Sequence, residues 1–148
     1  MISFLYGYYP GLLRAALLAA GVAQLVIVCA SFAIPKVLDW KAELEPVGNL
    51  TRQIFWTYAG YILISNLAFG LLSAFAGGAL LDGSILASAV TGFIALWWGA
   101  RLAIQFFYFD TTQMPGGRFH KLAEAALILA FVFLAVVYAA ALSFNLGH

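Results

Sequence analysis

One arginine, Arg101, stands inside a long apolar stretch, where an ionisable side chain is costly and needs a reason. Trp97, Trp98 and Gln105 follow helical spacing from it and would share its helix face. Glu124, near the start of the next apolar stretch, would fall at a similar depth in an antiparallel helix pair. A guanidinium donates forked hydrogen bonds that suit anionic and carbonyl groups. The five residues form a candidate binding site for a lipid-soluble molecule, a lipid or a quinone, and no catalytic residue is assigned.

A structural interpretation of Arg101 stands beside this binding site. Its side chain could extend toward the membrane surface, with the aliphatic stem in lipid and the charge in water. It could also form an ion pair with Glu124 inside the membrane. The interpretations differ in one outcome: only a binding site predicts that replacing Arg101 with Met changes the lipid or quinone that purifies with the protein.

Two amide side chains, Gln24 and Asn66, also fall in the middle of apolar stretches. Asn66 shares a helix face with Gly70 and Ser73, and Gln24 shares one with Gly21. Small residues let membrane helices approach closely, and an amide can then form a hydrogen bond across the contact. We therefore expect Gln24 and Asn66 to join the first two helices. The alternative is a polar lining for a pocket or a pore.

Several kinds of chemistry have no residues to carry them in this sequence. Cys29 is the single cysteine, and the histidines are His120 and His148, which predicts no metal site and no cofactor. No Gly-rich phosphate loop, HExxH or GxSxG motif occurs. The net charge is +1, which provides no basic surface for a nucleic acid.

The composition indicates a membrane protein. Of 148 residues, 65% are hydrophobic and 9% are charged, whereas a soluble domain has about 45–50% and about 25%. A chain this short and this apolar could not cover its core with a polar surface, so the lipid bilayer must surround it. Its length predicts one transmembrane domain over residues 1–148.

Four segments are long enough to cross a bilayer, which takes about 20 apolar residues of helix. They cover residues 11–34, 55–76, 85–109 and 122–144. Breakers separate them: Pro35, then Gly77, Gly78 and Gly83, then the Pro-Gly-Gly at 115–117. The prediction is an all-α integral membrane four-helix bundle with up-down-up-down order.

The connection after the first span has its own pattern. Val37, Trp40, Leu44 and Val47 recur at helical spacing with charged residues between them. This predicts a short amphipathic helix on the membrane surface that ends at Pro46; the alternative is a packed connecting loop.

Lysine and arginine positions predict the orientation. Loops 35–54 and 110–121 carry most of these residues, so both should be cytoplasmic and both termini outside. A bacterial inner membrane is the expected location.

The layout resembles that of the DoxX-like group of small four-helix membrane proteins. The resemblance covers the whole chain and rests on Pro35 after the first span, Arg52 leading into Tyr58-Ala-Gly-Tyr61, and Gly99-Ala-Arg101 in the third span. It implies the four-helix fold and no particular activity or site residue.

Three functions fit these observations. The first is a non-enzymatic accessory or interaction subunit, or a homo-oligomer, because many small residues suit contacts with another membrane protein. The second is a binder or enzyme for a lipid-soluble molecule on the cytoplasmic side at Arg101. The third is a transporter or channel, which would require several copies of the chain because no carboxylate lies mid-span.

Overall fold

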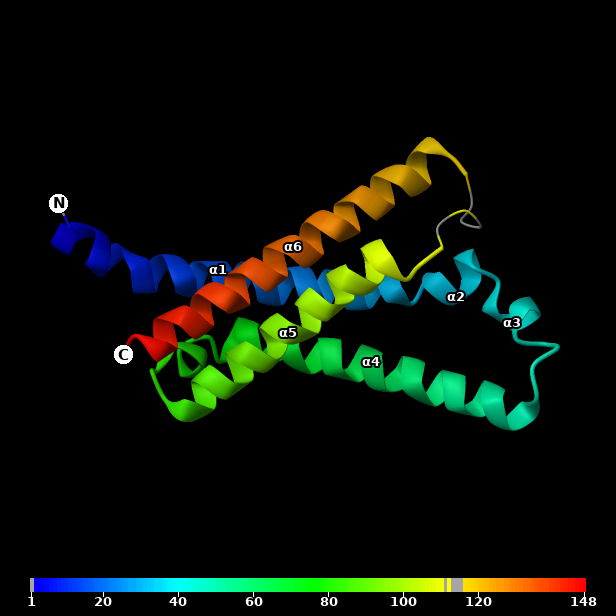
Figure 1. Ribbon diagram of the computed structural model, residues 1–148, viewed down its shortest axis with the longest axis horizontal. Coiled ribbons are helices and arrows are strands. Elements are labelled where there is room, and N and C mark those ends of the chain that lie inside the picture. The colour runs from blue at the N-terminus through cyan, green and yellow to red at the C-terminus, as the bar shows by residue number, and fades with distance from the viewer. Residues whose placement is uncertain (1, 111, 113–115) are drawn as a thin grey trace.

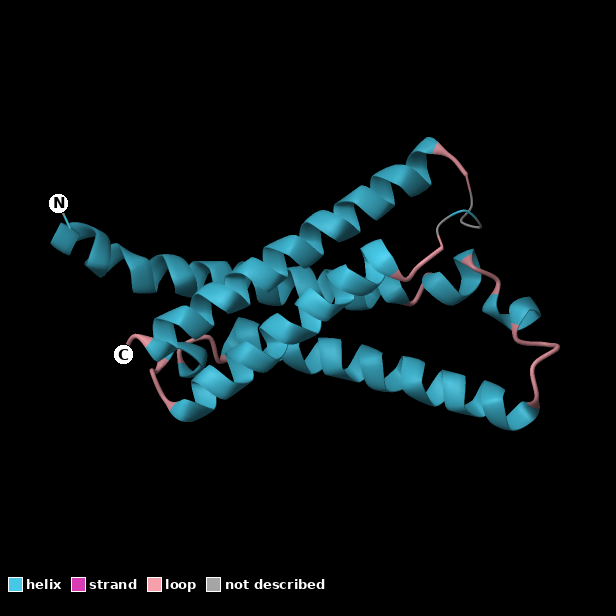
Figure 2. Ribbon diagram, in the orientation of Figure 1, coloured by secondary structure: helices cyan, strands magenta, loops and turns pink. Residues whose placement is uncertain are grey.

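The computed structural model describes residues 2–110, 112 and 116–148, with side chains from residue 9 onward. Its described part consists of helices joined by loops and turns (Figure 2). The elements are α1 (Ile2–Ser31), α2 (Ile34–Val37), α3 (Trp40–Glu43), α4 (Asn49–Phe75), the short 3₁₀ helix η1 (Ala79–Leu81), α5 (Ile85–Phe107) and α6 (Arg118–Leu146). Four helices in this part of the chain are long and apolar enough to cross a membrane. The prediction of an all-α four-helix membrane bundle is confirmed.

The long helices form two antiparallel hairpins, α1 with α4 and α5 with α6, and α1 also packs against α6. Figure 1 shows both termini and η1 at one end of the bundle, which we call the terminal end. The α1–α4 and α5–α6 connections lie at the opposite end, which we call the connection end (Figure 1). The order along the chain is therefore up-down-up-down.

The first long helix ends three residues earlier than the sequence indicated. We expected it to reach Ile34, but α1 ends at Ser31. Phe32 and Ala33 donate to carbonyls three residues back, a tightening that is common at helix ends. Pro35 instead occupies the first turn of α2, where its missing N–H has no helical partner to lose.

The amphipathic connection is helical in two pieces rather than one. The single turns α2 and α3 are separated at Asp39, which has φ 45°, a left-handed conformation that aspartate tolerates better than most residues. Trp40 of α3 packs edge-on against Phe55 and Trp56 of α4, at centroid distances of 4.9 and 5.6 Å. These contacts hold the connection against the start of α4.

Three consecutive residues, Asp82, Gly83 and Ser84, determine the α4–α5 turn at the terminal end. Gly83 has φ +73°, which favours glycine. Ser84 follows and caps α5, because its hydroxyl accepts a hydrogen bond from the Ala87 N–H at 3.0 Å. Asp82 in turn accepts from the Ser84 N–H at 2.9 Å.

The buried side chains are distributed unevenly along the bundle. Gly21 of α1 approaches α4 so closely that a Cβ there would lie 2.7 Å from the Ala74 nitrogen. No described residue of α4 before Asn66, of α5 after Trp98 or of α6 before Phe131 is buried. We call the part from the terminal end to these three residues the closed half, and the remainder the open half. In Figure 1, α4 and α6 diverge toward the connection end.

Candidate functional site

A buried hydrogen-bond network joins all four long helices at the boundary between the two halves. Trp98 Nε1 of α5 donates to Gln24 Oε1 of α1 at 3.2 Å. Gln24 Nε2 donates to the Tyr138 hydroxyl of α6 at 2.6 Å. That hydroxyl also shares a hydrogen bond with the Ser73 hydroxyl of α4. Gln24 and Tyr138 are fully buried, so the network fills the centre of the bundle at this level.

The second intramembrane amide makes a separate contact. Asn66 Oδ1 of α4 accepts from Trp97 Nε1 of α5 at 3.1 Å, and the Trp97 ring packs edge-on against Phe69. From the sequence, Gln24 and Asn66 were expected to join the first two spans to each other. In the structure they connect those spans to α5 and α6, and the close α1–α4 contact is made at Gly21.

A third polar contact fixes the terminal end, and sequence reasoning missed it. Asn145 of α6 donates from Nδ2 to the Leu80 carbonyl at 2.8 Å and accepts at Oδ1 from the Gly83 N–H at 3.1 Å. Among the described residues, no buried side-chain nitrogen or oxygen lacks a hydrogen-bond partner. The signal in the sequence was an amide near the end of an apolar stretch, a position that ordinarily faces the membrane surface.

Arg101 lies just beyond this network, in the open half. It follows Trp98 by three residues, so it is about 4.5 Å closer to the connection end. Its guanidinium carbon is 5.1 Å from the centroid of the Phe109 ring and 5.6 Å from that of Phe131, and the side chain is half-buried. Both distances suit attraction between a cation and an aromatic ring. No pattern in the sequence predicted that either phenylalanine would lie at the site.

The polar groups of Arg101 are not engaged by residues 2–110, 112 or 116–148: no salt bridge or hydrogen bond within this range involves the guanidinium. Glu124 stands at a different level. Trp98 stacks on Phe131 at a centroid distance of 5.3 Å, which sets the α5–α6 register. Glu124 is seven residues from Phe131, or about 10 Å closer to the connection end, and lies nearer the level of Gln105.

The structure therefore divides the predicted binding residues into two groups. Trp97, Trp98 and Arg101 cluster where α5 meets α4 and α6, together with Phe131. Gln105 and Glu124 are partly exposed and lie farther along the open half. A guanidinium beside aromatic rings that is not hydrogen-bonded to the described residues can donate hydrogen bonds to the oxygen atoms of a ligand head.

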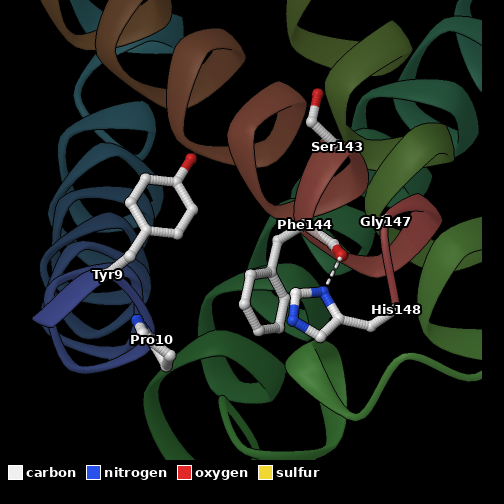
Figure 3. A pocket seen from close by; sticks show the side chains of 6 residues that line it. All are labelled: Tyr9, Pro10, Ser143, Phe144, Gly147 and His148. Atoms are coloured by element: carbon white, nitrogen blue, oxygen red, sulfur yellow. Dashed lines mark hydrogen bonds between the residues drawn. The ribbon is translucent and has the colours of Figure 1, made fainter. Parts of the chain in front are cut away.

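Two surface depressions lie away from this cluster. Figure 3 shows the first, about 240 Å³ at the terminal end, lined by Tyr9, Pro10, Ser143, Phe144, Gly147 and His148. There the His148 ring stacks on Phe144 and its Nδ1 lies 2.9 Å from the Phe144 carbonyl oxygen. The second, about 420 Å³, lies at the amphipathic connection and is lined by Asp39, Lys41, Ala42, Glu45 and Arg52. Neither contains a predicted site residue.

In the described ranges, no group of three or more His, Cys, Asp or Glu side chains could hold a metal ion. No protein-family model, no curated protein and no solved structure matches this chain.

Proposed function

We propose that this chain is a non-enzymatic membrane protein that binds a lipid-soluble molecule with a polar head at Arg101. One observation carries the proposal: the Arg101 guanidinium lies between Phe109 and Phe131, and no acceptor in the described residues takes its hydrogen bonds. A charged side chain inside a membrane helix is unfavourable, by about 2.5–3.5 kcal/mol at the helix centre and by less toward the ends, where Arg101 lies. A ligand head that accepts from the guanidinium would offset part of that cost.

The open half gives such a ligand a place for its tail. In Figure 1 α4 and α6 diverge there, and the residues of α4, α5 and α6 in this half are exposed or half-buried rather than buried. In a membrane, apolar material must cover the apolar side chains among them, because contact with water is unfavourable. A lipid tail along these side chains would cover them while the head stays at Arg101.

The side of the membrane follows from the lysine and arginine distribution. Lys36, Lys41, Arg52, Arg118 and Lys121 all belong to the connection end. Positive residues favour the cytoplasmic side. The proposal therefore places the ligand in the cytoplasmic leaflet of a bacterial-type inner membrane.

The test replaces Arg101 with Met, which keeps an apolar stem of similar length and removes the charge. Arg118→Met is the matched control, because Arg118 is an exposed cation at the start of α6. Native mass spectrometry of protein released gently from its own membrane should show a small molecule that stays with the wild type and with Arg118→Met and is lost from Arg101→Met. Equal retention by all three proteins would refute the proposal.

A second candidate function, a subunit of a larger assembly or a homo-oligomer, has one observation of its own. A Cβ added at Gly60 of α4 or Gly99 of α5 would meet no atom within 4 Å. A glycine on a membrane helix that contacts no neighbouring helix leaves room for the close approach of another one. The same mass spectra discriminate: complexes of defined stoichiometry that Gly99→Leu dissociates would favour assembly. A pore for transport would then have to lie between chains, because Gln24, Trp98 and Tyr138 fill the interior of this one.

A further inference from the structure

We propose that the ligand of Arg101 is an anionic phospholipid, held by its phosphate group, with an acyl chain between the two helix hairpins. This identification rests on the proposed function and narrows it from any lipid-soluble molecule to one charge class. The observations that carry it are the local charge and the position of the guanidinium against the Phe109 and Phe131 rings, on the helix face from which Trp97 reaches α4.

The charge around Arg101 favours an anion over a neutral head. Arg101 is the only charged residue of α5. Asp110, the nearest acidic residue along the chain, directs its carboxylate at Thr112, with distances of 3.0 Å to the backbone nitrogen and 2.6 Å to the hydroxyl. Glu124, the acidic residue of α6, forms no salt bridge with the guanidinium. The cation therefore lacks a protein counter-charge among the described residues.

A quinone and a phospholipid differ in how they would meet this cation. A quinone carbonyl accepts a hydrogen bond but carries no charge. A phosphate diester carries one negative charge and offers two oxygens in a geometry that a guanidinium matches with two parallel hydrogen bonds. In a medium of low dielectric constant the neutralisation of charge is the larger effect.

The position of the guanidinium defines where the rest of the lipid lies. Trp97, one helical turn from Arg101 on the same face, contacts Asn66 and Phe69 of α4. The guanidinium itself rests on Phe109 and on Phe131 of α6, which both belong to the α5–α6 hairpin. A phosphate at Arg101 therefore contacts this hairpin, on the helix face from which Trp97 reaches α4, and we place its acyl chain between the diverging ends of α4 and α6 in the open half.

The depth of Arg101 is consistent with a head drawn slightly into the membrane. Arg101 precedes Phe107, the last residue of α5, by six residues, or about 9 Å of helix. An arginine side chain extends toward the surface over much of that distance. The phosphate therefore needs to descend only a short way from the headgroup level, and the aromatic rings of Phe109 and Phe131 cover the contact.

The experiment measures lipid binding to the full chain in detergent by native mass spectrometry. Phosphatidylglycerol, phosphatidylcholine and ubiquinone are added separately at matched concentrations. The wild type and Arg118→Met should each bind one phosphatidylglycerol per chain, at roughly tenfold lower concentration than phosphatidylcholine. Arg101→Met should lose that difference, and Arg101→Lys, which keeps the charge without the fork, should retain part of it.

Each alternative outcome has a defined meaning. If the wild type retains ubiquinone in preference to both lipids and Arg101→Met does not, the phospholipid is wrong and the binding function stands. If Arg101→Met binds phosphatidylglycerol as the wild type does, the phosphate contact at Arg101 is refuted. If no probe distinguishes the wild type from Arg101→Met, both the inference and the proposed function fall. The helical circular dichroism of each variant verifies that it is folded, and Arg101→Lys provides the comparison if Arg101→Met is not.

Discussion

The same four helices form the closed and open halves of this bundle, but polar side chains in the two halves make different contacts. In the closed half, polar side chains from different helices satisfy one another, as Gln24 does with Trp98 and Tyr138. In the open half, α4 and α6 diverge and the guanidinium of Arg101 rests on aromatic rings rather than on acceptors. The difference indicates that side-chain contacts in the closed half hold the four helices together, whereas the open half is where the proposed ligand would bind.

Adding one methyl group at the closest helix contact should have the largest effect on stability in the closed half. In Gly21→Ala, the new Cβ would lie 2.7 Å from the Ala74 nitrogen and 2.9 Å from the Gly70 oxygen, so the α1 and α4 backbones must separate. We expect a loss of about 3 kcal/mol in the free energy of unfolding, measured by denaturant titration in micelles. Gly60→Ala is the matched change in the open half and should have almost no effect, because no atom lies within 4 Å. Equal losses for the two variants would contradict the division into halves.

The central hydrogen-bond network should be the next most sensitive part. Gln24→Leu keeps the side-chain volume but leaves the Trp98 N–H without its acceptor and removes one partner of the Tyr138 hydroxyl. A buried donor that loses its partner costs about 1–3 kcal/mol, so we expect a loss of about 2 kcal/mol in the same titration. Tyr138→Phe tests the network from the other side and should cost less, since Gln24 still accepts from Trp98. A stable Gln24→Leu protein would mean that apolar packing alone holds the closed half.

The sequence predicted some features of the closed and open halves and not others. Long apolar stretches and their breakers predicted the four spans, because the thickness of a bilayer imposes a minimum length on any helix that crosses it. The polar positions Gln24 and Asn66 were equally visible. Their partners were not, because Tyr138 and Trp97 reach them only through the rotation and register of helices that are distant in sequence, and packing sets both.

The open half was harder to predict for a related reason. Antiparallel order alone suggested that Arg101 and Glu124 lie at one level, but the stacking of Trp98 on Phe131 sets a different register. The amphipathic connection followed helical periodicity in the sequence, yet Asp39 breaks it into two turns. Where few side chains are buried, local backbone preferences and single aromatic contacts determine the structure, and a pattern of apolar residues records neither.

A stability measurement on Arg101→Met gives the clearest contrast with the closed half. The guanidinium makes no salt bridge within the described ranges, and its contacts with Phe109 and Phe131 are worth about 0.5–1 kcal/mol at a partly exposed site. Removing a charge from the membrane offsets that loss. We therefore expect the free energy of unfolding in lipid-free micelles to change by less than about 0.5 kcal/mol. A loss as large as that for Gln24→Leu would make Arg101 a structural residue of the bundle.

The smallest expected effect compares two carboxylates that make the same local contact at opposite ends. Hydrogen bonds from Ser84 hold the pKa of Asp82 below its usual value of 3.8, and those from Thr112 do the same for the pKa of Asp110. A carboxyl whose pKa is lowered in the folded state stabilises the fold above the unfolded pKa, and that contribution is lost as the pH falls through the folded value. Both contributions should therefore be present at neutral pH and disappear below about pH 4.

The two carboxylates should nevertheless differ in what their protonation does to the bundle. The Asp82 turn leads into Gly83, whose N–H donates to the buried Asn145, so the turn is tied to the closed half. The Asp110 turn lies at the connection end, beyond the last buried residue of α5. Asp82→Asn should slightly lower the midpoint of thermal unfolding at pH 7 and make it less dependent on pH between 3 and 5, whereas Asp110→Asn should change the midpoint less. The reverse order would show that the connection end, and not the terminal end, limits the stability of the bundle.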